Sequence, residues 1–210
     1  MLEEIYKDQN AYFSWRVKKV RRIEKRFAHM FEVKGKNCLD IGCGSEAALS
    51  YALCEKGAKV KGGDVNAAIV GSAKKFAPRA KLTVFEAENL PFKDGAFDFV
   101  FLLDVLEHVK DPEKAVKEAV RCTKKNGRLF IEFSPYWAQP SGHHLYPLGI
   151  PKGFLPFQFF PKSLTRHIVE HSKIKSKDSP GFLFWQFDSL NRLSVRNFRR
   201  IAKKLKGVKI

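Results

Sequence analysis

Short runs of apolar residues alternate along this chain with longer stretches in which apolar residues recur every three or four positions. The runs are predicted to be strands, at residues 37–41, 59–63, 82–86, 97–104 and 128–133. The stretches between them are predicted to be helices, at residues 46–56, 67–76 and 112–124. Strands that alternate with helices in this way predict an α/β fold with a parallel sheet and right-handed crossovers.

Turn and cap residues agree with these boundaries. Gly57 follows the first of these helices, where glycine commonly ends a helix. Pro112 stands in the first turn of another helix, where its missing N–H costs nothing. Phe97–Asp104 is apolar except at Asp98 and at Asp104 itself, which is typical of a central parallel strand buried on both faces. Outside this core we expect one or two helices within 3–32, a helix at 163–171, a strand at 182–187 and a basic helix at 194–206.

Acidic residues fall at the carboxyl ends of four predicted strands: Asp40, Asp64, Glu86 and Asp104. In a doubly wound sheet, ligands bind beyond these ends, near the point where the strand order reverses. Gly42 and Gly44 follow the first strand, and a turn rich in glycine lets a ligand lie against bare backbone. An acid about 20 residues further on is where such folds hold a ribose hydroxyl. The pattern therefore predicts an adenosine-containing ligand.

Asp40 helps to decide which ligand this is. The run from Gly42 to Ala47 also fits the dinucleotide fingerprint G-x-G-x-x-G/A, so a nicotinamide cofactor is one alternative. However, a carboxylate two residues before the first glycine would repel a diphosphate and would suit a cation. S-adenosylmethionine carries a sulfonium and an ammonium group and no phosphate, so Asp40 favours it. The alternative for Asp40 itself is a helix cap or a solvated acid.

Four blocks in unbroken order carry a family resemblance. They are Leu39–Gly44, Pro91–Asp98, Asp104–Pro112 and Asn126–Ile131. Together they resemble class I S-adenosylmethionine-dependent methyltransferases, and most closely the branch typified by the ubiquinone/menaquinone-biosynthesis C-methyltransferases. The resemblance covers roughly residues 37–134. It implies a Rossmann-like α/β fold, with a seven-stranded mixed sheet that is mostly parallel and has helices on both faces.

The resemblance also implies a set of cofactor-binding residues: Asp40, Gly42, Gly44, Asp64, Val65, Glu86, Ala87, Asp104 and His108. The glycine backbone would approach the methionine and ribose, and Asp64 would accept hydrogen bonds from both ribose hydroxyls. Glu86 would accept from the adenine amino group, although the family usually has Asp there. One departure is Glu46, which replaces the third glycine of the family's G-x-G-x-G turn; it could point outward or crowd the methionine tail.

The acceptor is expected to bind after the fifth strand. Residues 135–161 are rich in proline, aromatic residues and histidine, and we interpret them as a lid over the cofactor. Tyr136, His143 and His144 are the candidate catalytic residues, as a general base or as contacts to the acceptor. A pair of adjacent histidines without a matched acid or cysteine is weak evidence for a metal, so we expect none. The aromatic residues of the lid form either core under a long loop or a pocket for an apolar acceptor.

The formal net charge of +17 departs from an ordinary composition. Much of it lies in two basic segments with helical apolar spacing, within 16–26 and 192–209. Each segment is either a solvated helix face or a surface for an anionic partner, a membrane or a nucleic acid. The four cysteines lack paired C-x-x-C spacing, so we expect reduced thiols in a cytoplasmic protein. Residues 1–4 are acidic and lack the basic-then-apolar order of a signal peptide, and the chain has no apolar run near 18 residues, so we expect neither a signal peptide nor a membrane span.

The sequence therefore predicts one methyltransferase domain over residues 1–210. Its parts are N-terminal helices at 1–36, a cofactor-binding core at 37–134, a substrate lid at 135–161 and a C-terminal segment at 162–210. The leading function is methyl transfer from S-adenosylmethionine to a small-molecule acceptor, which is apolar or aromatic. The alternatives are an RNA or protein methyltransferase that docks through the basic helices, or a binding protein with this fold and no catalysis.

Overall fold

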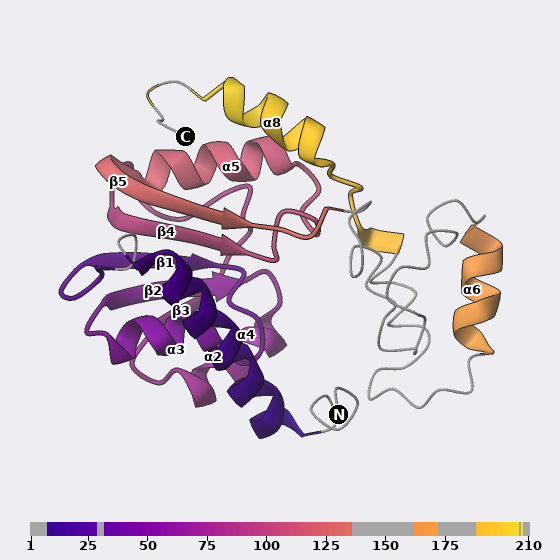
Figure 1. Cartoon of the computed structure of the whole chain (residues 1–210), viewed down its shortest axis with the longest axis horizontal. Helices are drawn as coiled ribbons and strands as arrows, with labels where there is room; N and C mark the ends of the chain where they lie inside the picture. Colours follow the sequence, from indigo (N-terminus) through magenta and orange to yellow (C-terminus); the bar gives the residue numbers. More distant parts are fainter. Residues whose placement is uncertain (1–7, 29–31, 136–161, 172–187, 206, 208–210) are drawn as a thin grey trace. The chain divides into compact units, whose positions relative to one another are not determined.

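The structure, a computed structural model, is shown in Figure 1. It describes residues 8–28, 32–135, 162–171, 188–205 and 207. The chain divides into two compact units. The core unit comprises residues 8–106 and 111–133, and the second unit comprises residues 1–7, 107–110 and 134–210. The expectation of one domain over the whole chain stays a prediction.

A five-stranded sheet forms the centre of the core unit. Its strands are β1 (Asn37–Ile41), β2 (Lys59–Asp64), β3 (Lys81–Val84), β4 (Phe97–Leu103) and β5 (Thr123–Glu132). All neighbouring strands run parallel, in the order β3-β2-β1-β4-β5. The chain steps outward from β1 to β3 and then crosses to β4, so the strand order reverses between β1 and β4. The two strands at this reversal are buried along almost their whole length, as expected for central parallel strands.

Helices connect the strands: α3 (Ala48–Glu55), α4 (Ala67–Phe76) and α5 (Pro112–Cys122). Right-handed crossovers in opposite directions from β1 place α3 and α4 on one face of the sheet and α5 on the other. Side chains cap two of these helices. Asn66 accepts hydrogen bonds from the N–H groups of Ala68 and Ile69, and Asp111 accepts one from Lys114 in the turn that Pro112 opens.

The first described helix, α2 (Gln9–Arg26), packs beside α3 over the sheet. An apolar cluster fills the space between these two helices and the sheet, and it includes Val17, Val20, Leu49, Leu53, Phe99 and Phe101. Phe27, which caps α2, meets Phe130 of β5 edge to face, with a ring-centroid separation of 5.4 Å. These contacts fix α2 against the core by one face only.

The second unit contains α6 (Lys162–Glu170) and α8 (Val195–Lys203). Ser194 caps α8 by accepting a hydrogen bond from the Asn197 N–H. Asn191 ties segment 107–110 to this unit, because its side chain donates to the Val109 carbonyl and its N–H donates to the Glu107 carbonyl. No helix among the residues described here has the length and apolar character needed to cross a bilayer.

Most predicted elements are confirmed, and two features differ. The strand predicted at 128–133 begins five residues earlier, because Thr123 already pairs with Phe97 before a register shift leads to Arg128. The described residues form five parallel strands, whereas seven strands in a mixed sheet were expected. The predicted strand at 182–187 and most of the predicted lid lie outside the described residues, so the mixed sheet stays a prediction.

Candidate functional site

The four acids predicted to share a site lie at one edge of the sheet. Asp40 is the penultimate residue of β1, Asp64 ends β2, Glu86 follows β3 by two residues, and Asp104 directly follows β4. Because all these strands run parallel, their carboxyl ends meet at the same edge, where the arrowheads point in Figure 1. This edge also contains the reversal of strand order between β1 and β4. Doubly wound sheets bind ligands at this position.

The glycine turn after β1 presents open backbone at this edge. Gly42 has φ +72° and its N–H donates to the Gly63 carbonyl of β2, which pins the start of the turn. A Cβ added at Gly42 would lie 2.4 Å from Val105 Cγ2, so packing excludes any larger residue. Gly44 has φ +65°, and a Cβ there would meet nothing within 4 Å. The space above Gly44 is therefore a cradle that a side chain would fill, and it fits a ligand laid against the backbone.

Asp40 lies beneath this turn, with 2% of its surface exposed. Its Oδ2 accepts hydrogen bonds from the Ser50 N–H at 3.1 Å and from Ser50 Oγ at 2.7 Å, both in the first turn of α3. Burial raises the pKa of Asp40 to about 6, and the hydrogen bonds from Ser50 only partly oppose this rise. The carboxylate therefore anchors α3 to β1, which is the helix-capping role that the sequence left open. A further role beside the cofactor stays a prediction.

Asp64 and Glu86 are more accessible. One carboxylate oxygen of Asp64 accepts a hydrogen bond from the Asn66 N–H at 3.2 Å, and no described residue donates to the other oxygen. Glu86 is exposed, and Val65 beside Asp64 has 66% of its surface exposed. Ala87 is buried in the turn after Glu86. Two carboxylates with acceptor capacity, together with the exposed apolar side chain of Val65, fit the hydroxyls and base of a nucleoside.

Asp104 is engaged by two cations from α2. Its Oδ2 accepts hydrogen bonds from Lys19 Nζ at 2.7 Å and from Arg16 Nη1 at 3.2 Å. Lys19 Nζ also lies 3.2 Å from Glu132 Oε1 at the end of β5. Burial alone would raise the pKa of Asp104, but Lys19 and Arg16 outweigh it and lower that pKa. Asp104 adopts φ +57°, a left-handed conformation that is rare outside glycine and typical of functional sites.

Glu46, which replaces a glycine of the family turn, points into the protein. Only 6% of its surface is exposed, and its Oε1 accepts a hydrogen bond from Ser45 Oγ at 2.6 Å. Arg16 is desolvated, yet its pKa is raised because the charges of Tyr12, Asp104 and Glu46 outweigh burial. Glu46 thus belongs to the same electrostatic cluster as Arg16 and Asp104. The outward, solvated orientation considered from the sequence is wrong.

Sequence reasoning missed Arg16 and Lys19 as site residues. Both lie in a segment that is basic throughout, and they were counted as part of a possible docking face. A signal was nevertheless present in the helical period, because Arg16 is one turn before the buried Val20 and on the same side of α2. A cation on the apolar side of an amphipathic helix needs a buried or half-buried acid, and Asp104 supplies it.

The predicted roles of four other residues are not tested by the structure. Tyr136, His143 and His144 lie outside the described residues, so their role at the acceptor stays a prediction. His108 is an exposed residue of the second unit, and its role at the cofactor also stays a prediction. All four cysteines are free and buried, and burial raises the pKa of each thiol, as expected for inert reduced cysteines. No cluster of three potential metal ligands occurs among the described side chains.

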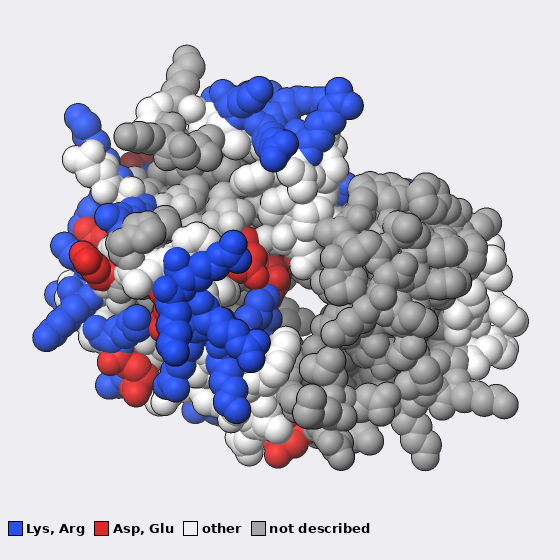
Figure 2. All heavy atoms as spheres, in the orientation of Figure 1, with Lys and Arg blue, Asp and Glu red and all other residues white. Residues whose placement is uncertain are grey.

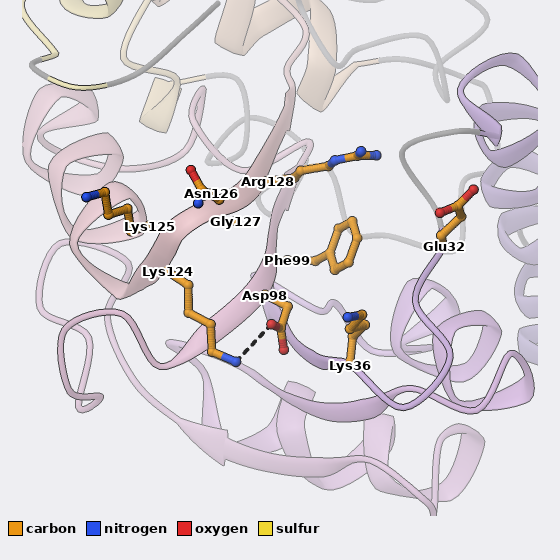
Figure 3. Close-up of a pocket in the computed structure, with 9 residues that line it drawn as sticks. All are labelled: Glu32, Lys36, Asp98, Phe99, Lys124, Lys125, Asn126, Gly127 and Arg128. Carbon is orange, nitrogen blue, oxygen red and sulfur yellow. Dashed lines mark hydrogen bonds and ion pairs between the residues drawn. The ribbon is translucent and has the colours of Figure 1, made fainter.

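A separate hollow of about 360 Å³ lies at the opposite edge of the core unit (Figure 3). It is lined by the beginnings of β4 and β5, and Asp98 at its wall is paired with Lys124 at 2.8 Å. Asp98 also accepts a hydrogen bond from the Asn37 N–H at 2.9 Å, so this pair joins the amino ends of three strands. The hollow is distant from the carboxyl edge by the length of the strands, and the pairing within it is structural.

Comparison with known proteins shows that this chain is similar to methyltransferases. Residues 39–131 match the family model described as a methyltransferase domain. The ubiquinone biosynthesis O-methyltransferase of Coxiella burnetii is 34% identical over 154 residues, which cover 68% of this chain and 65% of that protein. The chloroplastic tocopherol O-methyltransferase of Arabidopsis thaliana is 34% identical over 124 residues, 53% of this chain and 36% of that protein. The chain thus spans less than two thirds of the length of these curated relatives.

Among solved structures, the Bacillus halodurans protein BH2331 covers 90% of this chain and 67% of its own, with a TM-score of 0.58 and 17% identity. At this identity the likeness supports the α/β fold alone. Both curated relatives are O-methyltransferases, whereas the sequence resemblance was to C-methyltransferases of the same quinone-related branch.

Proposed function

We propose that this chain, which belongs to the class I S-adenosylmethionine-dependent methyltransferases, transfers the methyl group of S-adenosylmethionine to a small-molecule acceptor. The observation that carries the proposal is the carboxyl edge of the core sheet. There the open backbone of Gly44 lies at the strand-order reversal, at the same edge as acids from four parallel strands. The pattern suits a cationic nucleoside better than a diphosphate.

The site offers a distinct partner for each part of the cofactor. In this proposal Asp64 accepts from the ribose hydroxyls, and Glu86 with the Ala87 backbone faces the adenine. The cradle over Gly44 takes the methionine portion. Arg16 and Lys19, which reach the same edge from α2, are suited to its α-carboxylate, since guanidinium and ammonium groups bind carboxylates through charge-assisted hydrogen bonds. The ammonium of the cofactor then has Asp104 as its counter-charge.

The donor supplies an already activated methyl group, so the protein chiefly has to align the acceptor and keep water out. A general base is needed only where the acceptor must lose a proton. We assign that role, together with acceptor contact, to Tyr136, His143 and His144 in the predicted lid. An apolar or phenolic acceptor is favoured, because the named relatives act in ubiquinone biosynthesis and on tocopherol.

The proposal is tested by S-adenosylhomocysteine release with a panel of phenols, catechols and hydroquinones of increasing alkyl length. We expect turnover with at least one phenolic acceptor. In the His143→Ala variant, turnover should fall by about 10²-fold or more while S-adenosylhomocysteine affinity is unchanged, since a positioned base contributes about 10²–10⁴-fold. His167→Ala, an exposed histidine on α6, is the matched control and should retain full turnover.

Two outcomes would contradict the proposal. Equal loss of cofactor affinity in His143→Ala and Asp64→Ala would mean that the lid is misplaced. Cofactor binding without turnover on any small acceptor, but with methylation of RNA or of protein substrates, would favour the alternative function.

A further inference from the structure

Two helices carry the same basic pattern on their exposed faces. On α2 the pattern comprises Lys18, Arg21, Arg22 and Lys25, called here the α2 stripe. On α8 it comprises Arg196, Arg199, Arg200 and Lys203, called here the α8 stripe. In both, the spacing is i, i+3, i+4 and i+7, which aligns four cations along one side of a helix. Figure 2 shows Lys and Arg side chains gathered over α2 and, separately, over α8.

These stripes are not explained by interactions within the protein. All eight side chains belong to exposed residues, and none pairs with an acid among the described residues. The α2 stripe is on the side of the helix opposite Arg16, so it is distinct from the cations that contact Asp104. Like charges three and four residues apart destabilise a helix. The same destabilising spacing of like charges occurs on both α2 and α8. An anion outside the protein would offset the repulsion in each stripe.

We propose that the α2 and α8 stripes bind the anionic surface of a lipid bilayer and so bring the enzyme to an acceptor dissolved in that bilayer. This inference rests on the proposed function, because an apolar phenolic acceptor is concentrated in membranes. Charge complementarity supports it: residues 189–210 contain no acid, and the α2 stripe has no exposed acid within its length. Anionic lipid headgroups attract such polybasic segments.

The apolar neighbour of the α8 stripe favours lipid over nucleic acid. Val195, at the start of α8, is 45% exposed and lies one turn from Arg199. An exposed aliphatic side chain beside a basic face adds apolar contact with a bilayer interface, as in other interfacial helices. It has no comparable use against the phosphates of a nucleic acid. On the apolar side of α8, Ile201 is buried and Phe198 is half-buried, so binding is peripheral.

The test measures co-sedimentation of the full chain with vesicles, without cofactor or acceptor. Vesicles of phosphatidylcholine alone are compared with vesicles that contain 30% phosphatidylglycerol, a composition chosen for the assay. Each Lys or Arg near an anionic surface strengthens partitioning by about fivefold. Replacing one stripe with four glutamines should therefore weaken partitioning by about 10²-fold or more.

A matched control removes the same charge elsewhere. It replaces four exposed lysines of the core unit with glutamine: Lys74, Lys75, Lys81 and Lys93. This control should bind anionic vesicles within a few-fold of the unchanged chain. The unchanged chain should not bind vesicles of phosphatidylcholine alone. Its binding to anionic vesicles should fall steeply when the assay salt is raised from about 50 to about 500 mM, because salt screens exposed charges.

Three results would overturn the inference. The first is a failure of the chain to bind anionic vesicles. The second is an equal loss of vesicle binding in the stripe and control variants. The third is tight RNA binding that the stripe variants lose, in a chain that does not bind vesicles. S-adenosylhomocysteine affinity, measured on the same variants in solution, should be unchanged. If the unchanged chain binds S-adenosylhomocysteine but not anionic vesicles, the membrane inference fails and the proposed function stands. If the chain binds vesicles but not S-adenosylhomocysteine, the proposed function is contradicted instead.

Discussion

The ion pair between Lys19 and Asp104 holds α2 at the carboxyl edge of the sheet. The double variant Asp104→Asn/Lys19→Gln tests this contact. Asp104 and Lys19 are 2.7 Å apart, and their side chains are 24% and 32% exposed. At an effective permittivity of about 20, this separation corresponds to about 6 kcal/mol of attraction before any desolvation cost is subtracted. Desolvation and partial exposure consume most of it, and a net coupling of about 1–2 kcal/mol remains.

The coupling is measured with a double-mutant cycle by urea unfolding at low salt, with Asp104→Asn, Lys19→Gln and the double variant. Each single variant should lower the free energy of unfolding, and the double variant should lose about 1–2 kcal/mol less than the sum of the two. For a chain of this length, a loss of that size lowers the Tm by about 2–8 °C. Salt at about 1 M should shrink the coupling, because the Debye length falls to about 3 Å.

The dependence of stability on pH in the acidic range is a second test of the same ion pair. The pKa of Asp104 is lowered in the folded chain, so its contribution is present above the pKa of the unfolded chain and is lost as pH falls through the folded pKa. Asp104→Asn should remove this acid-dependent loss. Additive single variants, with a coupling below about 0.3 kcal/mol at low salt, would refute the view that this ion pair holds α2 over the site.

Three further predictions concern the residues beneath the cradle. The raised pKa of Asp40 keeps its carboxyl group protonated in the folded chain at pH values where it is ionised in the unfolded chain, so stability should fall as pH rises from about 4 to 6. Asp40→Asn should abolish this fall. Urea unfolding at both ends of the pH range measures it, and an unchanged pH dependence of the unfolding free energy in the variant would contradict the prediction. Gly42→Ala should cost about 2–4 kcal/mol of unfolding free energy from its positive φ and its clash with Val105, whereas a variant as stable as the parent would show that the turn can shift. Gly44→Ala should cost only about 1 kcal/mol yet weaken S-adenosylhomocysteine binding by calorimetry, and unchanged affinity would place the ligand elsewhere.

The strand pattern was predictable because local sequence decides it. The apolar run of β4 and the alternation with capped helices follow from burial on both faces and from turn chemistry, and both appear in the structure. The start of β5 was less accessible to sequence reasoning. Thr123 leaves α5 and pairs with Phe97 at once, and the left-handed Asn126 then shifts the register, which no local pattern signals.

The site was predictable to the extent that strand ends determine it. Four parallel strands bring Asp40, Asp64, Glu86 and Asp104 to one edge whatever their side chains do. Their partners were not predictable, because the sequence shows the apolar side of α2 but not which strand end that side meets. Arg16 and Lys19 therefore read as surface charge until their contacts with Asp104 are seen.

The most direct test of the central claim is calorimetric titration of the chain with S-adenosylhomocysteine, alongside Asp64→Ala. Asp94→Ala is the matched control, since Asp94 is 81% exposed and lies away from the carboxyl edge. The unchanged chain and the control should bind with micromolar affinity or better, and Asp64→Ala should bind at least about 100-fold more weakly, because two charge-assisted hydrogen bonds to the ribose are lost. Absence of heat with the unchanged chain at high micromolar ligand, or equal affinity in Asp64→Ala, would contradict the account.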